Sequence, residues 1–403
     1  MPKSAEIILK PGRDKSVHHR HPWLFSGAIE RVDGSPEPGD IVRVRAANGE
    51  FLAHAYYNSR SQIALRLLSW DEFDTIDAPW WTRMIERAIA RRIPLSNLTG
   101  TNSYRLIYSE ADGLPGLIVD RYADYLVCQF LTAGIERIRT HIVDVLWERL
   151  RPEAMIDLSD NDVRKLEGLA ASGGVIRGTE PVGQVVIHEN GFRYAVDLGH
   201  GQKTGYYLDQ RLNRSHVAGL ASGRRVLDCF CYSGGFTIPI LASSPVSVTC
   251  IDSSEPALEI LRANVAMLTE DRPELSAGEI EFANANVFEE LRKFRDQDRR
   301  FDMIVLDPPK LAASQSQVER AKRAYKDLNL LALKLLSHGG ILATFSCSGA
   351  ISRQDLQGVV AWAATDAKRR VQVVDHLGQG EDHPVLASFP ESEYLKGLIC
   401  RVE

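Results

Sequence analysis

At roughly 100–200 residues per domain, the 403 residues of this chain allow about two or three domains. Hydrophobic residues make up 44% and charged residues 25%, which excludes global disorder, collagen-like repetition and a disulfide-dense scaffold. With 48 Lys and Arg against 53 Asp and Glu, the net charge of −5 argues against a protein that coats nucleic acid non-specifically.

Targeting and metal-binding signals are weak in this sequence. The apolar runs are far shorter than the ~20 residues that span a bilayer, and residues 1–15 carry charges throughout, unlike a secretory signal. The cysteines lack the paired spacing of a zinc site. We therefore expect no metal, no membrane contact, reduced thiols and a cytoplasmic location. The cysteines are Cys128, Cys229, Cys231, Cys250, Cys347 and Cys400.

Residues 1–72 are predicted to form a small β-barrel. Short apolar runs at Ile7–Leu9, Ile41–Val44 and Ile63–Leu67 favour strands, and Asn48-Gly49 is a strong hairpin signal. Residues 1–70 hold 10 basic against 7 acidic side chains. The basic and aromatic side chains of this segment suit contacts with the RNA backbone and stacking on its bases. The alternative is that they serve structural packing or a dimer contact. The residues in question are Lys10, Arg13, Lys15, Arg20, Trp23 and Phe25.

Residues 73–185 are predicted to form a connecting α+β domain. Helical periodicity covers Ala78–Arg92 and Gly134–Leu150, and strand-like runs lie between them. These runs are Tyr104–Ile107, Gly116–Asp120 and Tyr125–Leu131. We identify no catalytic motif in this segment, which favours a scaffold role.

Residues 186–403 alternate strand-like and helical patterns, which predicts an α/β domain with a mostly parallel sheet. The predicted helices are Pro256–Leu268, Gln317–Leu336 and Ser352–Ala367. The seven predicted strands are Arg225–Phe230, Val246–Asp252, Ile280–Ala285, Phe301–Leu306, Gly340–Phe345, Val371–Leu377 and Leu398–Val402.

Each of the first two of these strands has an acidic residue near its end, and a glycine-containing turn follows the first. Asp228 ends a buried run, and Phe230 and Gly234 lie in the following turn, where glycine lets a ligand approach the backbone. The spacing lacks the G-x-G-x-x-G pattern of a dinucleotide fold and suits a nucleoside with an amino-acid tail. Asp252 ends the next strand, where a carboxylate can accept from both ribose hydroxyls.

Two further motifs follow the fourth and fifth strands. Asp307 precedes Pro308 and Pro309, whose rings stop the strand at the edge where open α/β sheets bind ligands. Cys347 follows the next strand and is expected at the same crevice. A buried cysteine is usually a small hydrophobe, but a thiol at that position is a candidate nucleophile.

These four motifs resemble those of class I S-adenosylmethionine-dependent methyltransferases. Further segments are similar to the RlmI-type bacterial family that methylates carbon 5 of cytosine in large-subunit (23S) ribosomal RNA. The similar segments are residues 10–16, 21–28, 104–107, 110–116, 120–121, 200–211, 382–385 and 390–397. The resemblance spans nearly the whole chain. It implies an RNA-binding PUA domain at 1–72, a central α+β domain at 73–185 and a Rossmann-like methyltransferase domain at 186–403.

The resemblance also implies site roles. Asn286 stands where an acidic residue usually meets the adenine, and its amide oxygen can still accept from the adenine amino group. The expected S-adenosylmethionine-binding residues are Asp228, Phe230, Gly234, Asp252, Asn286, Asp307 and Gln210. The expected substrate-binding residues are Lys203, Tyr207, Pro308 and Lys310.

Carbon 5 of cytosine is a poor nucleophile, and thiolate addition to C6 converts the ring into an enamine. The resemblance makes Cys347 the nucleophile and Asp307 a catalytic partner that holds the base. The two-cysteine RNA cytosine-5 enzymes carry a further cysteine just after the proline of the fourth-strand motif. This chain reads Pro308-Pro309-Lys310 there, which looks more like the one-cysteine uridine-5 enzymes. The identity of the base that removes the C5 proton stays open. Glu391 is one candidate, and the alternative is that Glu391 is an exposed loop carboxylate without a catalytic role.

Other functions remain as alternatives. A guanine-N7 enzyme needs no cysteine nucleophile, and an exocyclic-amine (guanine-N2) enzyme favours an aromatic residue where Lys310 stands. A non-catalytic RNA-binding assembly factor would not need the glycines and acids. The missing glycine pattern argues against a dehydrogenase. Family resemblance makes large-subunit ribosomal RNA the expected partner and a homodimer plausible.

Overall fold

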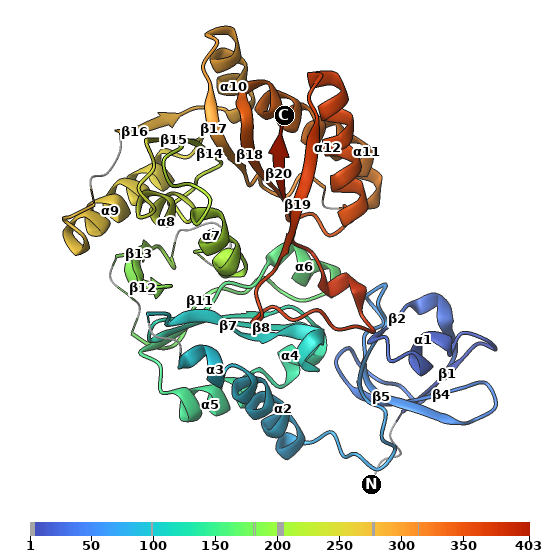
Figure 1. Ribbon diagram of the computed structural model, residues 1–403. Helices are drawn as coiled ribbons and strands as arrows, with labels where there is room; N and C mark the ends of the chain where they lie inside the picture. The colour runs from blue at the N-terminus through green and yellow to red at the C-terminus, as the bar shows by residue number, and fades with distance from the viewer. Residues whose placement is uncertain are drawn as a thin grey trace. The chain divides into compact units, whose positions relative to one another are not determined.

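The computed structural model describes residues 5–97, 100–179, 181, 183–199, 205–275, 279–312 and 314–403. The chain divides into two compact units, shown in Figure 1. Unit 1 comprises Met1–Val185, Asp197–Tyr206 and Asp382–Ser392. Unit 2 comprises Val186–Val196, Tyr207–Glu381 and Glu393–Glu403. The predicted boundary at 185 falls where the first segment of unit 1 ends, and two later segments return to unit 1. The predicted division into three domains remains a prediction.

The first part of unit 1 is a six-stranded sheet in the order β2-β6-β5-β4-β1-β3. Asn48-Gly49 lies between β4 and β5, which pair antiparallel as predicted, and Gly49 takes a φ of 87°. A core of alternating residues such as Ile7 and Val44 lies against this sheet. The strands are β1 Glu6–Leu9, β2 Trp23–Leu24, β3 Ile29–Asp33, β4 Ile41–Arg45, β5 Phe51–Tyr57 and β6 Leu65–Ser69, with helix α1 at Lys15–His18.

The second part of unit 1 is a five-stranded sheet in the order β11-β10-β9-β8-β7, with its own hydrophobic core. Helix α2 begins after Asp77, whose side chain accepts from Trp80 N, and it buries Trp80 and Trp81. The strands are β7 Ser103–Tyr108, β8 Leu117–Tyr122, β9 Tyr125–Phe130, β10 Ala154–Asp157 and β11 Gly174–Gly178. The helices are α2 Ala78–Arg91, α3 Ile93–Ser96, α4 Ala133–Arg137, α5 Arg139–Leu150 and α6 Asn161–Leu166.

In the described part of unit 2, a seven-stranded sheet has the order β16-β15-β14-β17-β18-β20-β19. The first five strands of this order are parallel, and β20 pairs antiparallel with both β18 and β19. This confirms the predicted mostly parallel sheet. The strands are β14 Arg225–Cys229, β15 Ser247–Asp252, β16 Glu279–Asn284, β17 Phe301–Leu306, β18 Leu336–Ser346, β19 Val371–Gly378 and β20 Lys396–Val402. A separate pair consists of β12 Val185–Glu189 and β13 Phe192–Val196.

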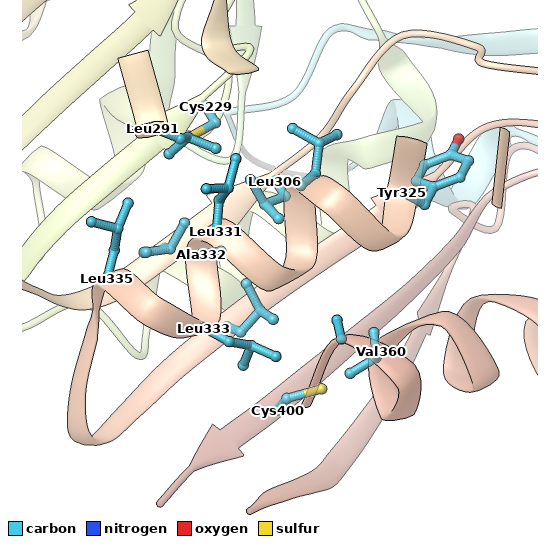
Figure 2. Packing of buried hydrophobic residues seen from close by; sticks show 14 of the residues in the cluster. Cys229, Leu291, Leu306, Tyr325, Leu331, Ala332, Leu333, Leu335, Val360 and Cys400 are labelled. Carbon is cyan, nitrogen blue, oxygen red and sulfur yellow. The ribbon is translucent and has the colours of Figure 1, made fainter. Parts of the chain in front are cut away.

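Helices of unit 2 bury apolar faces against this sheet. In Figure 2, Leu333 of α11 lies towards Val360 of α12 and Cys400 of β20, all within one core cluster. The helices are α7 Arg211–Ala218, α8 Thr237–Leu241, α9 Glu255–Asp271, α10 Val287–Asp296, α11 Val318–Leu335 and α12 Arg353–Ala367. Within the described ranges, none of the helices is long and apolar enough to cross a membrane.

Candidate active site

The candidate residues gather because parallel strands end at one edge of a sheet. Asp228 lies near the end of β14, and Asp252 is the last residue of β15. Asp307 directly follows β17, and Cys347 directly follows β18. The chain order reverses between β14 and β17, which is where open α/β sheets form a ligand crevice. The structure thus brings these four predicted residues to one edge.

The turn after β14 is tightly packed. Phe230 and Tyr232 take left-handed backbone conformations, with φ of 61° and 49°. Gly234 has a φ of 89°, and a Cβ there would lie 2.2 Å from Cδ1 of Leu261 on α9. Gly234 therefore permits the close approach of this turn to α9, which is a packing role.

Asp228 is a buried carboxyl group with one oxygen engaged. Its side chain is 1% exposed, and the Thr237 hydroxyl donates to its Oδ2 at 2.6 Å. Its Oδ1 is buried and accepts no hydrogen bond from the described residues. Burial raises the pKa of Asp228 to about 7, and the charge of Asp252 adds to that rise.

Asp252 is oriented by the backbone. The N–H groups of Tyr232 and Ser254 donate to its two carboxylate oxygens, each at 2.9 Å. Each oxygen keeps a further lone pair, so the carboxylate can still accept from two ribose hydroxyls.

Asn286 caps α10. Its side-chain oxygen accepts from the backbone N–H groups of Phe288 at 3.0 Å and Glu289 at 3.4 Å. We expected this oxygen to accept from an adenine amino group, but both of its lone pairs serve the helix cap. The exposed amide nitrogen of Asn286 remains as a donor, so its contact with adenine stays a prediction.

Asp307 accepts a hydrogen bond from a buried glutamine. Gln210, 2% exposed, donates from Nε2 to Oδ2 of Asp307 at 3.0 Å, and its own carbonyl accepts from Asn213 at 2.6 Å. Burial, followed by the charge of Asp209, raises the pKa of Asp307 to about 7. Near neutral pH this group can therefore either accept or donate a proton.

Asp209 is a site residue that the sequence reasoning missed. The Tyr394 hydroxyl donates to its Oδ2 at 2.5 Å, and its buried Oδ1 has no hydrogen-bond partner among the described residues. Its position directly before Gln210 was the available signal. Nearby, Arg214 forms a buried bidentate pair with Glu189 at 2.7 Å.

Tyr207 lies close to the reactive groups. Its ring packs edge-on against Tyr232, with centroids 5.7 Å apart. Burial raises the pKa of Tyr207, and the charges of Tyr232, Asp307 and Cys347 raise it further. The predicted substrate residue Tyr207 thus shares an environment with the predicted catalytic residues.

The other predicted substrate residues differ in exposure. Pro308 is buried, and Lys310 is exposed to solvent. Lys203 lies outside the described residues, so its predicted role stays a prediction.

Cys347 differs from the other cysteines in accessibility. All six cysteines belong to the described residues; five are buried, and Cys347 is half-buried. Its Sγ lies 3.9 Å from the Pro308 carbonyl oxygen, to which it donates. Strand β20, which pairs with β18 in the sheet, begins at Lys396, a buried lysine that the sequence reasoning missed. Among the described residues, the candidate site included, no cluster of three or more His, Cys, Asp or Glu side chains is arranged to hold a metal.

Glu391 and Trp23 have structural partners in unit 1. His21 lies 3.3 Å from the Glu391 carboxylate. Trp23 donates from Nε1 to Glu110 at 2.7 Å and packs against Phe389 with ring centroids 4.6 Å apart. Trp23 is thus engaged in packing rather than available for base stacking.

Comparison with known sequences identifies the family. The model described as S-adenosylmethionine-dependent methyltransferase matches residues 170–388, and that of the PUA-like domain matches residues 7–70. The protein named ribosomal RNA large subunit methyltransferase I from Shewanella frigidimarina is 45% identical over 400 residues, covering 99% of this chain and 100% of the relative. The chain belongs to this methyltransferase family. The Aeromonas salmonicida protein of the same name is also 45% identical, with 99% of both chains covered.

Two solved structures share the fold across nearly the whole chain. A putative S-adenosylmethionine-dependent methyltransferase from Streptococcus mutans matches with a TM-score of 0.83 at 19% identity, covering 98% of this chain and 99% of the other. A putative methyltransferase complexed with SAH matches with a TM-score of 0.85 at 20% identity and the same coverage. These matches confirm the predicted fold class.

This family member depends on S-adenosylmethionine, and the residues present fit that molecule. Asp228 offers a buried carboxyl oxygen that no described residue engages. Asp252 presents an oriented carboxylate suited to ribose hydroxyls. Both lie at the sheet edge, where nucleosides bind in folds of this kind.

Proposed function

We propose that this chain methylates carbon 5 of a cytosine in large-subunit (23S) ribosomal RNA through a covalent adduct between Cys347 and C6. The substrate is inferred from the names of the full-length relatives. One observation supports methylation at carbon 5 of cytosine: the half-buried thiol of Cys347 lies at the sheet edge that also holds Asp307.

The side chains support each part of this chemistry. When bound, S-adenosylmethionine supplies an electrophilic methyl group. The Cys347 thiolate adds to C6 and forms an S–C6 bond, which places electron density on C5. Asp307, with a pKa of about 7, can hold N3 of the ring and share a proton with it during this addition. After C5 gains the methyl group, loss of the C5 proton to a base expels Cys347 and restores the double bond.

The PUA-like part is proposed to contact the RNA backbone. Lys10, Arg13, Lys15 and Arg20 lie in this part, and Phe25 is 52% exposed and can stack on a base. Trp23 is excluded from that role because its indole is engaged with Glu110 and Phe389.

A methylation assay with Cys347 variants tests the proposal. We expect the parent protein to form 5-methylcytidine in large-subunit RNA, detected by nucleoside mass spectrometry, and Cys347→Ala to lose at least about a thousandfold in rate because covalent catalysis is removed. Cys400→Ala, which alters a buried cysteine of β20, is the matched control and should keep the activity.

RNA containing 5-fluorocytidine provides a second readout. The fluorine replaces the proton that the base must remove, so the S–C6 adduct should persist as a protein–RNA band that Cys347→Ala lacks. Full methylation by Cys347→Ala would falsify the covalent mechanism. A product at guanine N7 or N2 would instead refute the cytosine assignment.

A further inference from the structure

Lys396, the first residue of β20, is a lysine with 3% of its surface exposed. It pairs across the sheet with Ser346, the residue before Cys347. Its Nζ donates to the carbonyl oxygen of Ser348 at 3.5 Å and to that of Glu393 at 3.3 Å. The backbone of Lys396 therefore lies beside the residue before Cys347, and its amine bonds the residue after Cys347.

The surroundings of Lys396 combine burial with compensating charge. Lysine is rarely this buried without partners. Burial lowers the pKa of Lys396, whereas the negative charges of Glu393, Cys347 and Asp355 act to raise it and Arg353 acts to lower it. The Glu393 carboxylate accepts from Arg353 at 3.0 Å, whereas Lys396 donates to the backbone carbonyl of Glu393.

An ionised Asp307, which shares the surroundings of Cys347, would otherwise oppose a thiolate. Burial, together with the charges of Cys347 and Asp307, raises the pKa values of Tyr207 and Tyr325, so their hydroxyls stay neutral. A second negative charge beside Asp307 is unfavourable unless a cation offsets it. The exposed Lys310 is screened by water, whereas Lys396 is buried and acts through a medium of lower dielectric constant.

We propose that the Lys396 ammonium group holds Cys347 as a thiolate, ready to add to carbon 6 of the target base. The inference rests on the nucleophilic role proposed above for Cys347 and makes Lys396 a positioning residue. The thiolate is the reactive form, and a free cysteine with a pKa near ~8.5 supplies only a small fraction of it at neutral pH. A cation held close to the thiol lowers the pKa of the thiol and so raises that fraction.

Alkylation of the full-length, RNA-free protein tests this directly. The rate at which iodoacetamide labels Cys347 is followed from about pH 6 to pH 10 by mass spectrometry of its peptide. We expect Lys396→Met to move the midpoint upward by about one pH unit or more, and so to slow labelling about tenfold below the midpoint. Lys396→Arg should retain most of the parent profile because it keeps the charge.

Matched variants isolate the charge effect. Lys310→Met removes an exposed cation from the neighbouring motif and should leave the profile within a few tenths of a pH unit. Lys396→Gln keeps a donor for the carbonyls but lacks the charge, so it serves if Lys396→Met fails to fold. Binding of S-adenosylmethionine, measured by calorimetry, reports whether each variant is folded. A profile unchanged in a folded Met or Gln variant overturns the proposal.

Methylation kinetics separate this role from a structural one. The Lys396→Gln variant should lose kcat at neutral pH, recover part of it at alkaline pH, and keep the KM for S-adenosylmethionine. Activity that stays low at every pH would contradict the inference. If alkylation shifts as expected while Cys347→Ala still methylates RNA, the proposed covalent function fails and the coupling of Lys396 to the thiol stands.

Discussion

Asp228 and Asp302 are two carboxyl groups of one sheet whose surroundings shift the pKa in opposite directions. Burial raises the pKa of Asp228 from 3.8 to about 7, whereas hydrogen bonds from Arg225 lower that of Asp302 to about 2. Between about pH 4 and 7 the unfolded chain has released the Asp228 proton and the folded chain retains it. The contribution of Asp228 to the free energy of unfolding therefore falls as pH rises through that window.

The substitution Asp228→Asn should accordingly stabilise the ligand-free protein at alkaline pH. A shift of about three pKa units corresponds to at most roughly 4 kcal/mol, and the Asn carbonyl can still accept from Thr237. The gain should be largest above about pH 7 and disappear near pH 4, as measured by urea denaturation. The same variant should bind S-adenosylmethionine at least about tenfold more weakly.

Asp302→Asn is the control of opposite sign. The lowered pKa of Asp302 contributes stability above about pH 4 that is lost as pH falls towards 2. This variant should be destabilised at neutral pH and approach the parent protein in acid. An Asp228→Asn variant that is less stable than the parent at every pH would contradict the account of its buried charge.

At the residue scale, the strand pattern alone was enough to predict where several side chains lie, while their roles stay predictions. Asp228, Asp252 and Cys347 fall at strand ends, and parallel pairing brings such ends together. The burial of Lys396 and Asp209 was not predictable in this way. Their burial depends on neighbours supplied by distant segments, and lysine and aspartate are ordinarily surface residues.

At the scale of elements, the turn between β14 and α8 depends on its contact with α9. Gly234→Ala combines a left-handed backbone conformation with a Cβ only 2.2 Å from Leu261 Cδ1. We expect a loss of about 2–4 kcal/mol in the free energy of unfolding, measured by denaturant titration, because both strain and overpacking oppose folding.

Gly358→Ala is the matched glycine control. Gly358 lies within α12, and its added Cβ would meet no other atom within 4 Å. Alanine favours the helix by about 0.5–1 kcal/mol, so this variant should be slightly stabilised. Adding Leu261→Ala to Gly234→Ala should cost less than the sum of the two single changes, since it removes the clashing atoms. Strict additivity would show that Leu261 is not the obstacle.

The helix and strand pattern was predictable because hydrophobic periodicity reports which face of an element is buried. The structure extends the predicted strand Gly340–Phe345 to Leu336–Ser346. The helical run Gly134–Leu150 is divided into α4 and α5 around Ile138. Such boundaries depend on local caps and tertiary contacts, which periodicity does not report.

At the scale of the whole molecule, a buried ionic cluster joins the two sheets of unit 1. Arg66 of β6 donates to Glu110 at 3.0 Å and to Glu167 at 2.9 Å, and all three are nine-tenths or more buried. Trp23 donates to the same Glu110 oxygen, and Asn58 donates to Glu167 at 2.9 Å. The PUA-like part is thus tied to the central sheet by charge as well as by apolar packing.

Removing Arg66 leaves two carboxylates without their shared cation. We expect Arg66→Met to destabilise unit 1 by about 3–5 kcal/mol, because breaking a buried pair exposes the desolvation cost of the remaining charge. Hydrogen exchange should speed up at β2, β6 and residues 109–112, while β14 and β17 of unit 2 keep their protection. Adding Glu110→Gln should restore part of the lost protection, since it neutralises one of the stranded carboxylates. Equal loss of protection in both units, or no rescue by Glu110→Gln, would show that the cluster does not hold the PUA-like part to the central sheet.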